Sequence, residues 1–345
     1  MIAIHNNLSD VLFHYRWVAY CEENKIPYKL VDCYANNIIE QLEGCSALMW
    51  HYHQASSKDI VMAKPLLFAL EQSGMPVFPD FNTGWHFDDK VGQKYLLEGL
   101  KTALVPTWVF YEKKTAIDWI EQTSFPKVFK LRGGAGSQNV QLAKTKNAAI
   151  KIVNKAFGNG FPAYDAWGSL KERFRKWKLG KTTFFDVVKG CIRLVHKPHY
   201  TKVMGREINY VYFQEFIPNN DSDIRIIVVD GKAFGIKRMN RENDFRASGG
   251  GTILYDKEHI NEKCVKASFE YSKNLNAQCI AYDFVLDSEQ NPLLIEISYG
   301  FANGGYDACT GYWDEQLNWY PGTFNPYGWM VELLIKKLKR YDTCN

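Results

Sequence analysis

Phe125–Lys144, FPKVFKLRGGAGSQNVQLAK, is the stretch of sequence that decides the fold. Residues 127–132 alternate between two faces, which predicts a strand that carries Lys130 on one face and leads into a glycine-rich loop. Glycines tolerate positive φ, and a turn rich in them leaves backbone N–H groups able to bind an anion such as phosphate. The residues after the loop predict a second strand, not the helix that a Walker A loop requires. The pattern alone therefore fits either a phosphate-binding loop or a tight hairpin turn.

The composition is that of a globular protein large enough for two or three domains. Of its 345 residues, 46% are hydrophobic and 23% are charged, which excludes disordered, collagen-like and coiled-coil proteins. No apolar run is long enough to span a membrane, and the N-terminus lacks the basic and apolar regions of a signal peptide. Eight scattered cysteines without a C-x-x-C pair fit free thiols in a reducing compartment. We therefore expect a cytoplasmic protein without structural zinc.

Residues 1–85 predict a small parallel α/β domain, because short apolar runs alternate with helical patterns. The ligand crevice of such a domain lies at the carboxyl ends of its strands. His51 and His53 lie there, after the apolar run SALMW, and alternate onto one face. No third metal ligand is near them in the sequence. We therefore interpret them as a substrate-facing pair or as a pair satisfied inside the domain.

A hairpin that carries charged residues is predicted within residues 210–239. Two apolar strands meet at Asp230-Gly231, a dipeptide typical of a two-residue hairpin turn. Asp223 and Arg225 share one face of the first strand, opposite its isoleucines. Charged residues on the inner side of such a strand favour a ligand-facing role. The following loop, RENDFRASGGGT, adds Arg246 and a second run of glycines.

The last predicted hairpin, IAYDFVLDSEQNPLLIEIS, places two carboxylates opposite each other. If SEQN forms a four-residue loop, Asp287 pairs with Pro292 and Asp283 pairs with Glu296, with Ser298 one step further along. Like charges in such a pair destabilise a hairpin, so a cation is expected between them. Hard oxygen ligands on two strands suit Mg²⁺, which keeps waters and phosphate oxygens in its shell. A slipped register, with one carboxylate facing solvent, is the alternative.

The positive charge of the chain is concentrated in one segment. Residues 171–202 contain ten Lys and Arg against two acidic residues, a surplus of +8, whereas the whole chain has a net charge of +4. The rest of the chain is therefore mildly acidic. Aromatic residues, among them Phe174, Trp177 and Phe185, are interleaved with these cations. Such a segment could bind a polyanion or an anionic membrane surface, or it could be a solvated helix face.

In their order along the chain, these features resemble the ATP-grasp superfamily, and within it the RimK-type ligases that add amino acids to a carboxylate. The resemblance covers Phe87 to about Gly300. It is carried by the lysine before the glycine loop, the segment QEFI before D-x-R, the arginine- and glycine-rich loop, and the late Asp–Glu hairpin. It implies a mixed α/β ATP-grasp fold over residues 86–345, with two subdomains and a basic insertion at about 158–207. Residues 1–85 resemble the domain that precedes the ATP-grasp domain in that family.

The resemblance also implies a role for each candidate residue. The phosphates of ATP would contact Lys90, Lys130, Gly133, Gly134, Gly136 and Ser137. The adenosine would contact Gln214, Glu215, Ile217 and Asp223. The transferred phosphoryl group would face Arg225, Arg238 and Arg246, and Mg²⁺ would be held by Asp283, Glu296 and Ser298. The family usually ends this motif in E-x-N, so the serine leaves the second metal position open.

The resulting prediction is a ligase that uses Mg²⁺ and ATP to phosphorylate a carboxylate, after which an amine displaces phosphate to form an amide. The C-terminal stretch GYWDEQLNWYPGTFNPYGWMVELL resembles ATP-grasp proteins of bacterial surface-polysaccharide gene clusters, which suggests a uronic acid as the carboxylate. The expected partners are this carboxylate or glycan and an amine, not nucleic acid, with contact to an anionic membrane left open. The alternatives are another ATP-grasp reaction, by a kinase or a carboxylase, and a non-enzymatic protein that binds a polyanion.

Overall fold

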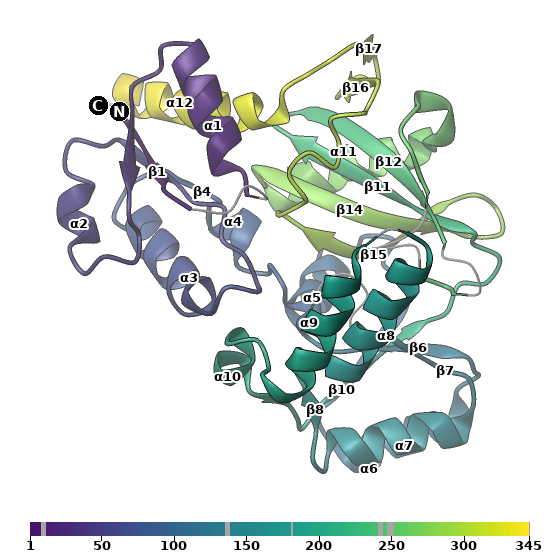
Figure 1. Cartoon of the computed structure of the whole chain (residues 1–345). Coiled ribbons are helices and arrows are strands. Elements are labelled where there is room, and N and C mark those ends of the chain that lie inside the picture. Colours follow the sequence, from purple (N-terminus) through teal and green to yellow (C-terminus); the bar gives the residue numbers. More distant parts are fainter. Residues whose placement is uncertain (8–11, 135–138, 181, 241–243, 247–251, 345) are drawn as a thin grey trace. The chain divides into compact units, whose positions relative to one another are not determined.

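The computed structural model describes residues 1–7, 12–134, 139–180, 182–240, 244–246 and 252–344, with the side chains of 340–344 left out. The chain divides into two compact units, which we describe separately (Figure 1). Unit 1 consists of Met1–Phe87, Ser222–Met239 and Ile253–Asn345. Unit 2 consists of Asp88–Asp221 and Asn240–Thr252.

Unit 1 begins with a four-stranded parallel sheet in the order β2-β1-β3-β4. Its strands are β1 (Ile2–His5), β2 (Tyr28–Val31), β3 (Ala47–Met49) and β4 (Val77–Phe78). The helices of this region are α1 (His14–Glu23), α2 (Ile38–Gln41), α3 (Ser57–Gln72) and α4 (Phe81–Gly84). Parallel neighbours need crossover connections, and the helical patterns between the apolar runs supply them. The predicted parallel α/β arrangement of this region is confirmed.

The main sheet of unit 1 is antiparallel, in the order β15-β14-β11-β12-β16-β17, with β13 beside β12. Its strands are β11 (Ser222–Val229), β12 (Lys232–Met239), β13 (Ile253–Leu254), β14 (Cys279–Leu286), β15 (Pro292–Ser298), β16 (Gly311–Asp314) and β17 (Trp319–Pro321). The helical elements are a 3₁₀ helix (Lys257–His259), α11 (Glu262–Leu275) and α12 (Pro326–Cys344). The turn between β11 and β12 is the predicted Asp230-Gly231 pair, with φ of 46° and 73°, as a tight hairpin of this kind requires.

The two faces of the main sheet have different partners. On one face α11 packs against β11 and β14, and the hydroxyls of Ser272 and Tyr282 lie 2.7 Å apart. The other face is apolar at one end, where Phe234 joins a core that includes Trp17 of α1 and Met330 of α12. Burying each such side chain contributes about 1.5–3 kcal/mol. At its other end this second face carries charged residues, so the hydrophobic core holds the strands that present them.

The loop between β14 and β15 differs from the predicted one. Pro292 pairs with Leu286, so the predicted pair of Asp287 with Pro292 is wrong by one residue. Asp287 belongs to the loop, where its carboxylate accepts hydrogen bonds from the N–H groups of Glu289 at 2.9 Å and Asn291 at 2.8 Å. An aspartate that caps its own turn in this way favours a loop position over a strand position.

Unit 2 contains an antiparallel sheet in the order β5-β10-β6-β7. Its strands are β5 (Thr107–Phe110), β6 (Lys127–Lys130), β7 (Gln141–Ala143) and β10 (Val211–Glu215). Helix α5 (Lys90–Gly99) precedes β5, and α6 (Lys113–Gln122) and α7 (Lys146–Ala156) lie side by side against one face of the sheet (Figure 1). The strand predicted over residues 127–132 is therefore present, and it ends at Lys130.

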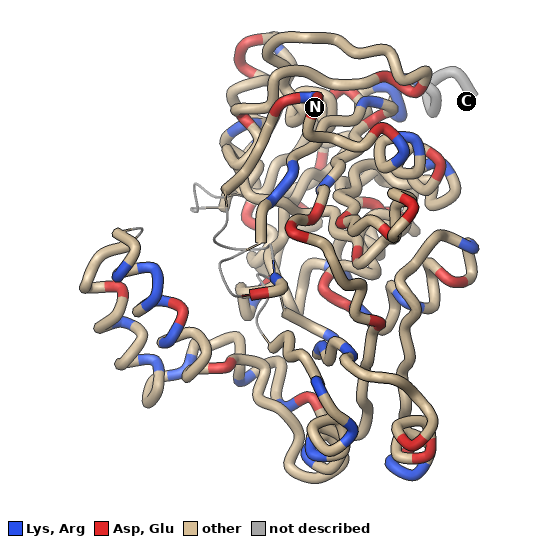
Figure 2. Tube along the Cα trace, turned by 90° about the vertical axis from the view of Figure 1, so that its right-hand side faces the viewer, with Lys and Arg blue, Asp and Glu red and all other residues tan. Residues whose placement is uncertain are grey.

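The basic insertion predicted at about 158–207 forms a helical hairpin in unit 2. Two short strands, β8 (Phe161–Pro162) and β9 (Arg206–Glu207), pair at its base. Between them lie α8 (Ala166–Lys178), α9 (Phe184–Val195) and α10 (Tyr200–Met204). Helices α8 and α9 pack against each other, and Figure 2 shows the basic positions spread along both of them. In the part of the chain that the structure describes, no helix combines the length and the apolar character needed to cross a membrane.

Candidate functional site

Strands β6 and β10 of unit 2 carry the first set of candidate residues, and their register fixes which way each side chain faces. Lys130 lies opposite Tyr212, and Val128 lies opposite Gln214, so these four residues share one face of the sheet. Lys130 is nearly buried, as is Gln214, whose Nε2 donates to Thr107 Oγ1 at 3.1 Å. A buried ammonium group costs free energy unless polar groups surround it. The strand therefore presents Lys130 to a polar environment, on the face away from the α6–α7 core.

The N-terminus of α5 lies against the start of the glycine loop. The Nζ of Lys90 donates to the carbonyl of Gly134 at 2.8 Å, and the N–H of Lys90 donates to the carbonyl of Arg132 at 2.9 Å. The N–H of Gly134 donates to a carboxylate oxygen of Asp88 at 2.7 Å. The N–H of Gly134 thus donates to an anionic oxygen, that of Asp88, and Lys90 is held beside the loop. Binding of phosphate by this loop stays a prediction.

Glycine suits both described positions of this loop. Gly134 has φ of 109°, a conformation that other residues rarely adopt. A Cβ on Gly133 would lie 3.2 Å from Asp88 Oδ2 and 3.1 Å from Met204 Cε. The candidates Gly136 and Ser137 lie outside the described residues.

Glu215 faces away from Lys130, on the opposite side of the same sheet. It lies across from Lys127, whose Nζ is 2.8 and 2.9 Å from the two carboxylate oxygens of Glu215. Lys127 is 1% exposed and its Nζ lies 5.4 Å from the ring centroid of Trp108. The carboxylate of Glu215, which is 30% exposed, is therefore paired with a buried lysine. Ile217 follows the end of β10, in a segment without regular structure.

The second set of candidate residues lies in unit 1, at the polar end of one face of the main sheet. Asp223 pairs with Arg238, and Arg225 pairs with Asp283, across neighbouring strands. Arg238 donates Nε and Nη2 to the two oxygens of Asp223 at 2.6 and 2.7 Å. Arg225 donates in the same two-pronged way to Asp283 at 2.5 and 2.6 Å, and Nη2 of Arg238 lies 3.1 Å from Asp283. We call these four side chains the Asp–Arg network.

The electrostatics of the Asp–Arg network centre on Asp283. Burial alone would raise the pKa of Asp283, but the guanidinium groups of Arg225 and Arg238 outweigh burial and hold that pKa below its ordinary value. Burial alone would lower the pKa of Arg225, and the charge of Asp283 instead raises it well above its ordinary value. Two-pronged bonds between charged groups are strong and directional. Asp283 is therefore ionised and firmly held at neutral pH.

Glu296 lies directly opposite Asp283, so the predicted carboxylate pair is confirmed. The register shift in the loop is cancelled by a bulge: Leu294 pairs with Phe284, and Ile295 is then the extra residue before Glu296. The cation expected beside the carboxylate pair is the guanidinium group of Arg225 on the adjacent strand.

Asp283 and Glu296 carry the hard oxygens that Mg²⁺ prefers, and the remaining ligands would have to be phosphate oxygens and water. Both oxygens of Asp283 are bonded to Arg225 in the described structure, so a metal ion would have to replace that guanidinium group. Among the described residues, no group of three or more His, Cys, Asp and Glu side chains could hold a metal ion by itself. Ser298 lies beyond Glu296 on the same strand, and its hydroxyl donates to the carbonyl of Gly300 at 2.8 Å. A neutral hydroxyl that is already engaged is a weaker metal ligand than the carboxylates.

The two histidines after β3 have separate surroundings. His51 is buried, its Nδ1 accepts a hydrogen bond from the N–H of Phe13 at 3.1 Å, and its ring stacks on the Phe13 ring at 3.6 Å. The Nδ1 of His53 accepts from the N–H of Ala55 at 3.1 Å. Burial lowers the pKa of both histidines, and that of His51 well below its ordinary value. Of the two interpretations left open by the sequence, the contacts of His51 favour a residue satisfied inside the domain.

The comparisons with known proteins identify the fold of the chain. Residues 195–308 match the family model of the RimK-like ATP-grasp domain, a range that includes the whole Asp–Arg network and Glu296. The RimK domain protein of Sphaerobacter thermophilus superposes on 97% of this chain and 100% of its own, with a TM-score of 0.53 and 13% identity. The chain has the ATP-grasp fold. The D-alanine–D-alanine ligase of Bacillus anthracis, solved with ATP, covers 99% of this chain and 97% of its own, with a TM-score of 0.52 and 14% identity.

One curated relative extends the similarity to the sequence. The alpha-aminoadipate–LysW ligase LysX of Saccharolobus solfataricus is 21% identical over 234 residues, which are 67% of this chain and 68% of that protein. The predicted resemblance to RimK-type ATP-grasp proteins is thereby confirmed at the level of fold and domain.

Within this ATP-grasp chain, three contacting residues were missed by the sequence analysis. Asp88 and Lys127 contact the loop and β10 across long stretches of sequence, which only the register reveals. Tyr306 lies in an irregular segment, and its hydroxyl is 3.5 Å from Nη1 of Arg225. No pattern in the sequence signals it.

The candidate Arg246 has a local partner. It belongs to unit 2, and its Nη2 lies 2.6 Å from a carboxylate oxygen of Asp244. Arg225 and Arg238 belong to unit 1. A catalytic role for Arg246 stays a prediction.

Proposed function

We propose that this ATP-grasp chain is a ligase that joins a carboxylate to an amine at the expense of ATP. The observation that carries the proposal is the Asp–Arg network with Glu296 beside it: two largely buried guanidinium groups and a pair of carboxylates on adjacent strands. The RimK-like domain match and the ligases among its relatives support the same reaction class.

The proposed reaction has two steps that balance. An oxygen of the substrate carboxylate attacks the γ-phosphorus of ATP, ADP leaves, and an acylphosphate forms. The nitrogen of the amine then attacks the acyl carbon, phosphate leaves, and the nitrogen loses a proton to give the amide. Charge builds up on phosphoryl oxygens in the first step and on the acyl oxygen in the second, and positioned cations stabilise both.

We assign the charge-stabilising role to Arg225 and Arg238. In the described network their guanidinium groups neutralise Asp223 and Asp283. We propose that they turn toward phosphoryl oxygens when the nucleotide binds, which exchanges one anionic partner for another. The network holds the two arginines next to each other before the substrate arrives, and the exchange of partners takes place when the nucleotide binds, before the phosphoryl group is transferred.

Asp283 and Glu296 are the residues that we propose hold Mg²⁺. Bound Mg²⁺ would neutralise phosphate charge and orient the phosphoryl group. Both carboxylates lie on the same face of the hairpin, and hard anionic oxygens are the ligands that this ion prefers.

Lys90, Lys130 and the N–H groups of the glycine loop are proposed to bind the phosphates of ATP. Because the carboxylate of Glu215 is paired with Lys127, we propose that Glu215 and Ile217 contact adenine through their backbone. The proposed carboxylate substrate is a uronic acid, which rests only on the resemblance of the C-terminal stretch. The described cysteines are free thiols, which supports work in a reducing compartment such as the cytoplasm.

The test is ATP turnover by the purified chain against a panel of uronic acids combined with amino acids, with release of ADP and phosphate measured. Turnover that requires both a carboxylate and an amine supports the ligase. ADP formed without any amine identifies a kinase, and turnover that requires bicarbonate identifies a carboxylase. A chain that binds ATP but gives no product with any pair refutes the choice of substrates, whereas a chain that binds no ATP refutes the ligase itself.

A further inference from the structure

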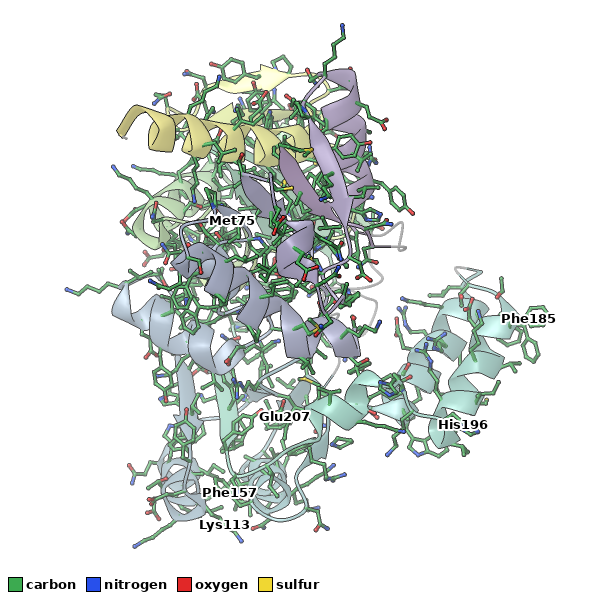
Figure 3. All side chains as sticks on the ribbon, turned by 90° about the vertical axis from the view of Figure 1, so that its left-hand side faces the viewer. Met75, Lys113, Phe157, Phe185, His196 and Glu207 are labelled. Atoms are coloured by element: carbon green, nitrogen blue, oxygen red, sulfur yellow. The ribbon has the colours of Figure 1, made fainter. Side chains whose placement is uncertain are left out.

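Helix α9 in unit 2 exposes an apolar stripe. Phe185, Val188, Ile192 and Val195 follow one another at intervals of three or four residues, which places them on one side of the helix. Phe185 is 76% exposed, Ile192 53% and Val195 79%. Figure 3 shows the side chain of Phe185 pointing away from the hairpin. An ordinary surface helix would turn such a stripe toward the core.

The inner side of α9 already has its own partner. Val187 and Gly190 are buried, and a Cβ on Gly190 would lie 2.9 Å from both Leu170 Cδ1 and Arg173 Cδ of α8. Helices α8 and α9 therefore meet closely along this side. The exposed stripe is a second apolar side of the same helix, so it is not a core face that the hairpin could bury by rotating α9.

The cations of the hairpin fall into two groups. Arg173 of α8 donates to the carbonyl of Asp186 of α9 at 3.2 Å and so links the two helices, whereas Arg175 pairs with Glu172 of its own helix through two bonds of 2.9 Å. Other cations face solvent. Among the described residues of this region, the exposed lysines are Lys171, Lys178, Lys189, Lys197 and Lys202.

Aromatic rings connect the exposed surface of the two helices. The ring centroids of Phe174 and Trp177 lie 5.6 Å apart, and those of Trp177 and Phe184 lie 5.5 Å apart. The Nζ of Lys178 lies 4.9 Å from the Phe174 centroid. All three rings are exposed, and so is Trp167 of α8. Tryptophan rings of this kind are enriched where protein meets the interface of a bilayer.

We propose that the α8–α9 hairpin docks on the surface of an anionic lipid bilayer. The stripe of α9 would enter the region between headgroups and acyl chains, and the exposed lysines would lie over the anionic headgroups. A nucleic acid would neutralise the lysines but leave Val188, Ile192 and Val195 in water, because aliphatic side chains do not stack on bases. A bilayer accommodates both the apolar stripe and the cations. The proposal goes beyond the ligase reaction and does not depend on it.

Co-sedimentation of the full chain with vesicles tests the proposal. One set of vesicles contains phosphatidylserine in phosphatidylcholine and the other phosphatidylcholine alone, each at low and high salt. We expect the chain to bind the anionic vesicles only. High salt should weaken this binding, because salt screens the attraction between exposed charges, with a Debye length of about 10 Å at 0.1 M. We expect two variants to lose at least about tenfold in affinity for the anionic vesicles. They are the stripe variant Phe185→Ser/Ile192→Ser and the charge variant Lys171→Gln/Lys189→Gln/Lys197→Gln.

A matched control replaces apolar residues that are exposed elsewhere. Ile39 of α2 is 61% exposed and Val61 of α3 is 56% exposed, and Ile39→Ser/Val61→Ser should leave vesicle binding unchanged. Far-UV circular dichroism checks that each variant keeps its helices.

The proposal is overturned if the unmodified chain does not bind anionic vesicles at low salt, or if the stripe variant binds them as tightly as the unmodified chain. Binding that depends on the lysines but not on the stripe would instead identify a polyanion site, which a heparin column would then retain. ATP turnover without vesicles should be the same for all these variants, so failure of this proposal and failure of the ligase are distinguishable.

Discussion

Asp283 lies between two guanidinium groups, those of Arg225 on β11 and Arg238 on β12. Arg238 is buried and the side chain of Arg225 is 17% exposed, so the members of the Asp–Arg network depend largely on one another for compensation of their charges. From the sequence alone, loss of Asp283 would relieve repulsion from Glu296. The contacts reverse that expectation, because Asp283 neutralises cations that come from strands far away in the sequence.

Asp283→Asn should therefore destabilise the ligand-free chain by about 3–5 kcal/mol, the usual cost of removing one partner of a buried ion pair. Glu296→Gln should change the free energy of unfolding by less than about 1 kcal/mol, since Glu296 is only half-buried. Both variants should lose Mg²⁺-dependent ATP turnover. Urea unfolding without ligands and turnover against Mg²⁺ concentration measure the two effects. If the two variants are equally stable, Asp283 does not stabilise the fold by neutralising Arg225 and Arg238.

Lys130→Ala should weaken ATP binding by about 10- to 100-fold, because a charge-assisted hydrogen bond contributes about 1.5–3 kcal/mol. Calorimetric titration with ATP measures the dissociation constant of the variant, and circular dichroism checks that the variant is folded. Lys144→Ala is the control, since Lys144 is an exposed lysine just after β7 of the same sheet. A folded Lys130→Ala variant that binds ATP as tightly as the control would remove Lys130 from the site.

At the scale of elements, β12 passes close to β11 where Gly235 lies. A Cβ on Gly235 would be 2.6 Å from Ile226 Cδ1 and 3.0 Å from the carbonyl oxygen of Arg225. The side chain of Ile226 can turn away, but the backbone oxygen is fixed by the strand. Glycine at this position therefore lets the strand that carries Arg225 pair closely with the strand that carries Arg238.

Gly235→Ala should lower the free energy of unfolding by about 1–3 kcal/mol, as overpacking of a well-filled region usually does. Gly99→Ala is the matched control, because no described heavy atom beyond its chain neighbours and the backbone of its own helix lies within 4 Å of the position that its Cβ would take. In a helix this control should be neutral or should stabilise by up to about 1 kcal/mol. Urea unfolding compares them. If the two substitutions have the same effect, the close approach at Gly235 has no energetic consequence.

Local sequence patterns predicted many of the strands and turns and the faces of strands that carry charged residues. The Asp230-Gly231 turn and the face shared by Asp223 and Arg225 follow from dipeptide chemistry and from the period of two in a strand. The Asp283–Glu296 pair was also predicted, although two errors cancelled: the loop is one residue longer than assumed, and a bulge absorbs the difference. Bulges leave no clear mark in a single sequence.

At the scale of the whole molecule, the order of motifs predicted the ATP-grasp fold, because that order is shared by chains with little sequence identity. The partners of the motifs were not predictable. Lys127 pairs with Glu215 and Asp88 contacts Gly134 only because distant segments become neighbours in the folded unit. A single sequence states which residues are present, but it does not give the register that brings them together.

The stability of unit 1 should depend on pH through three histidines, His5, His51 and His53. Burial lowers the pKa of each, although Asp59 opposes this for His5 and His53. His5 Nδ1 accepts from the N–H of Cys33 at 3.1 Å, and its Nε2 has no hydrogen-bond partner among the described residues. All three rings are therefore favoured in the neutral form in the folded chain.

Because the folded pKa values lie below the unfolded value of about 6.5, the unfolded chain binds more protons in acid. The stabilisation is fully present above about pH 6.5 and is lost as the pH falls from there toward the folded pKa values, by up to about 1.4 kcal/mol for each histidine at pH 5.5. Urea unfolding between pH 7.5 and 5.5 measures the slope of the free energy of unfolding against pH. His51→Gln should reduce it, and His259→Gln, at an exposed position of the 3₁₀ helix, should not. A free energy of unfolding that stays constant over this range would show that the buried imidazoles do not take up protons on unfolding.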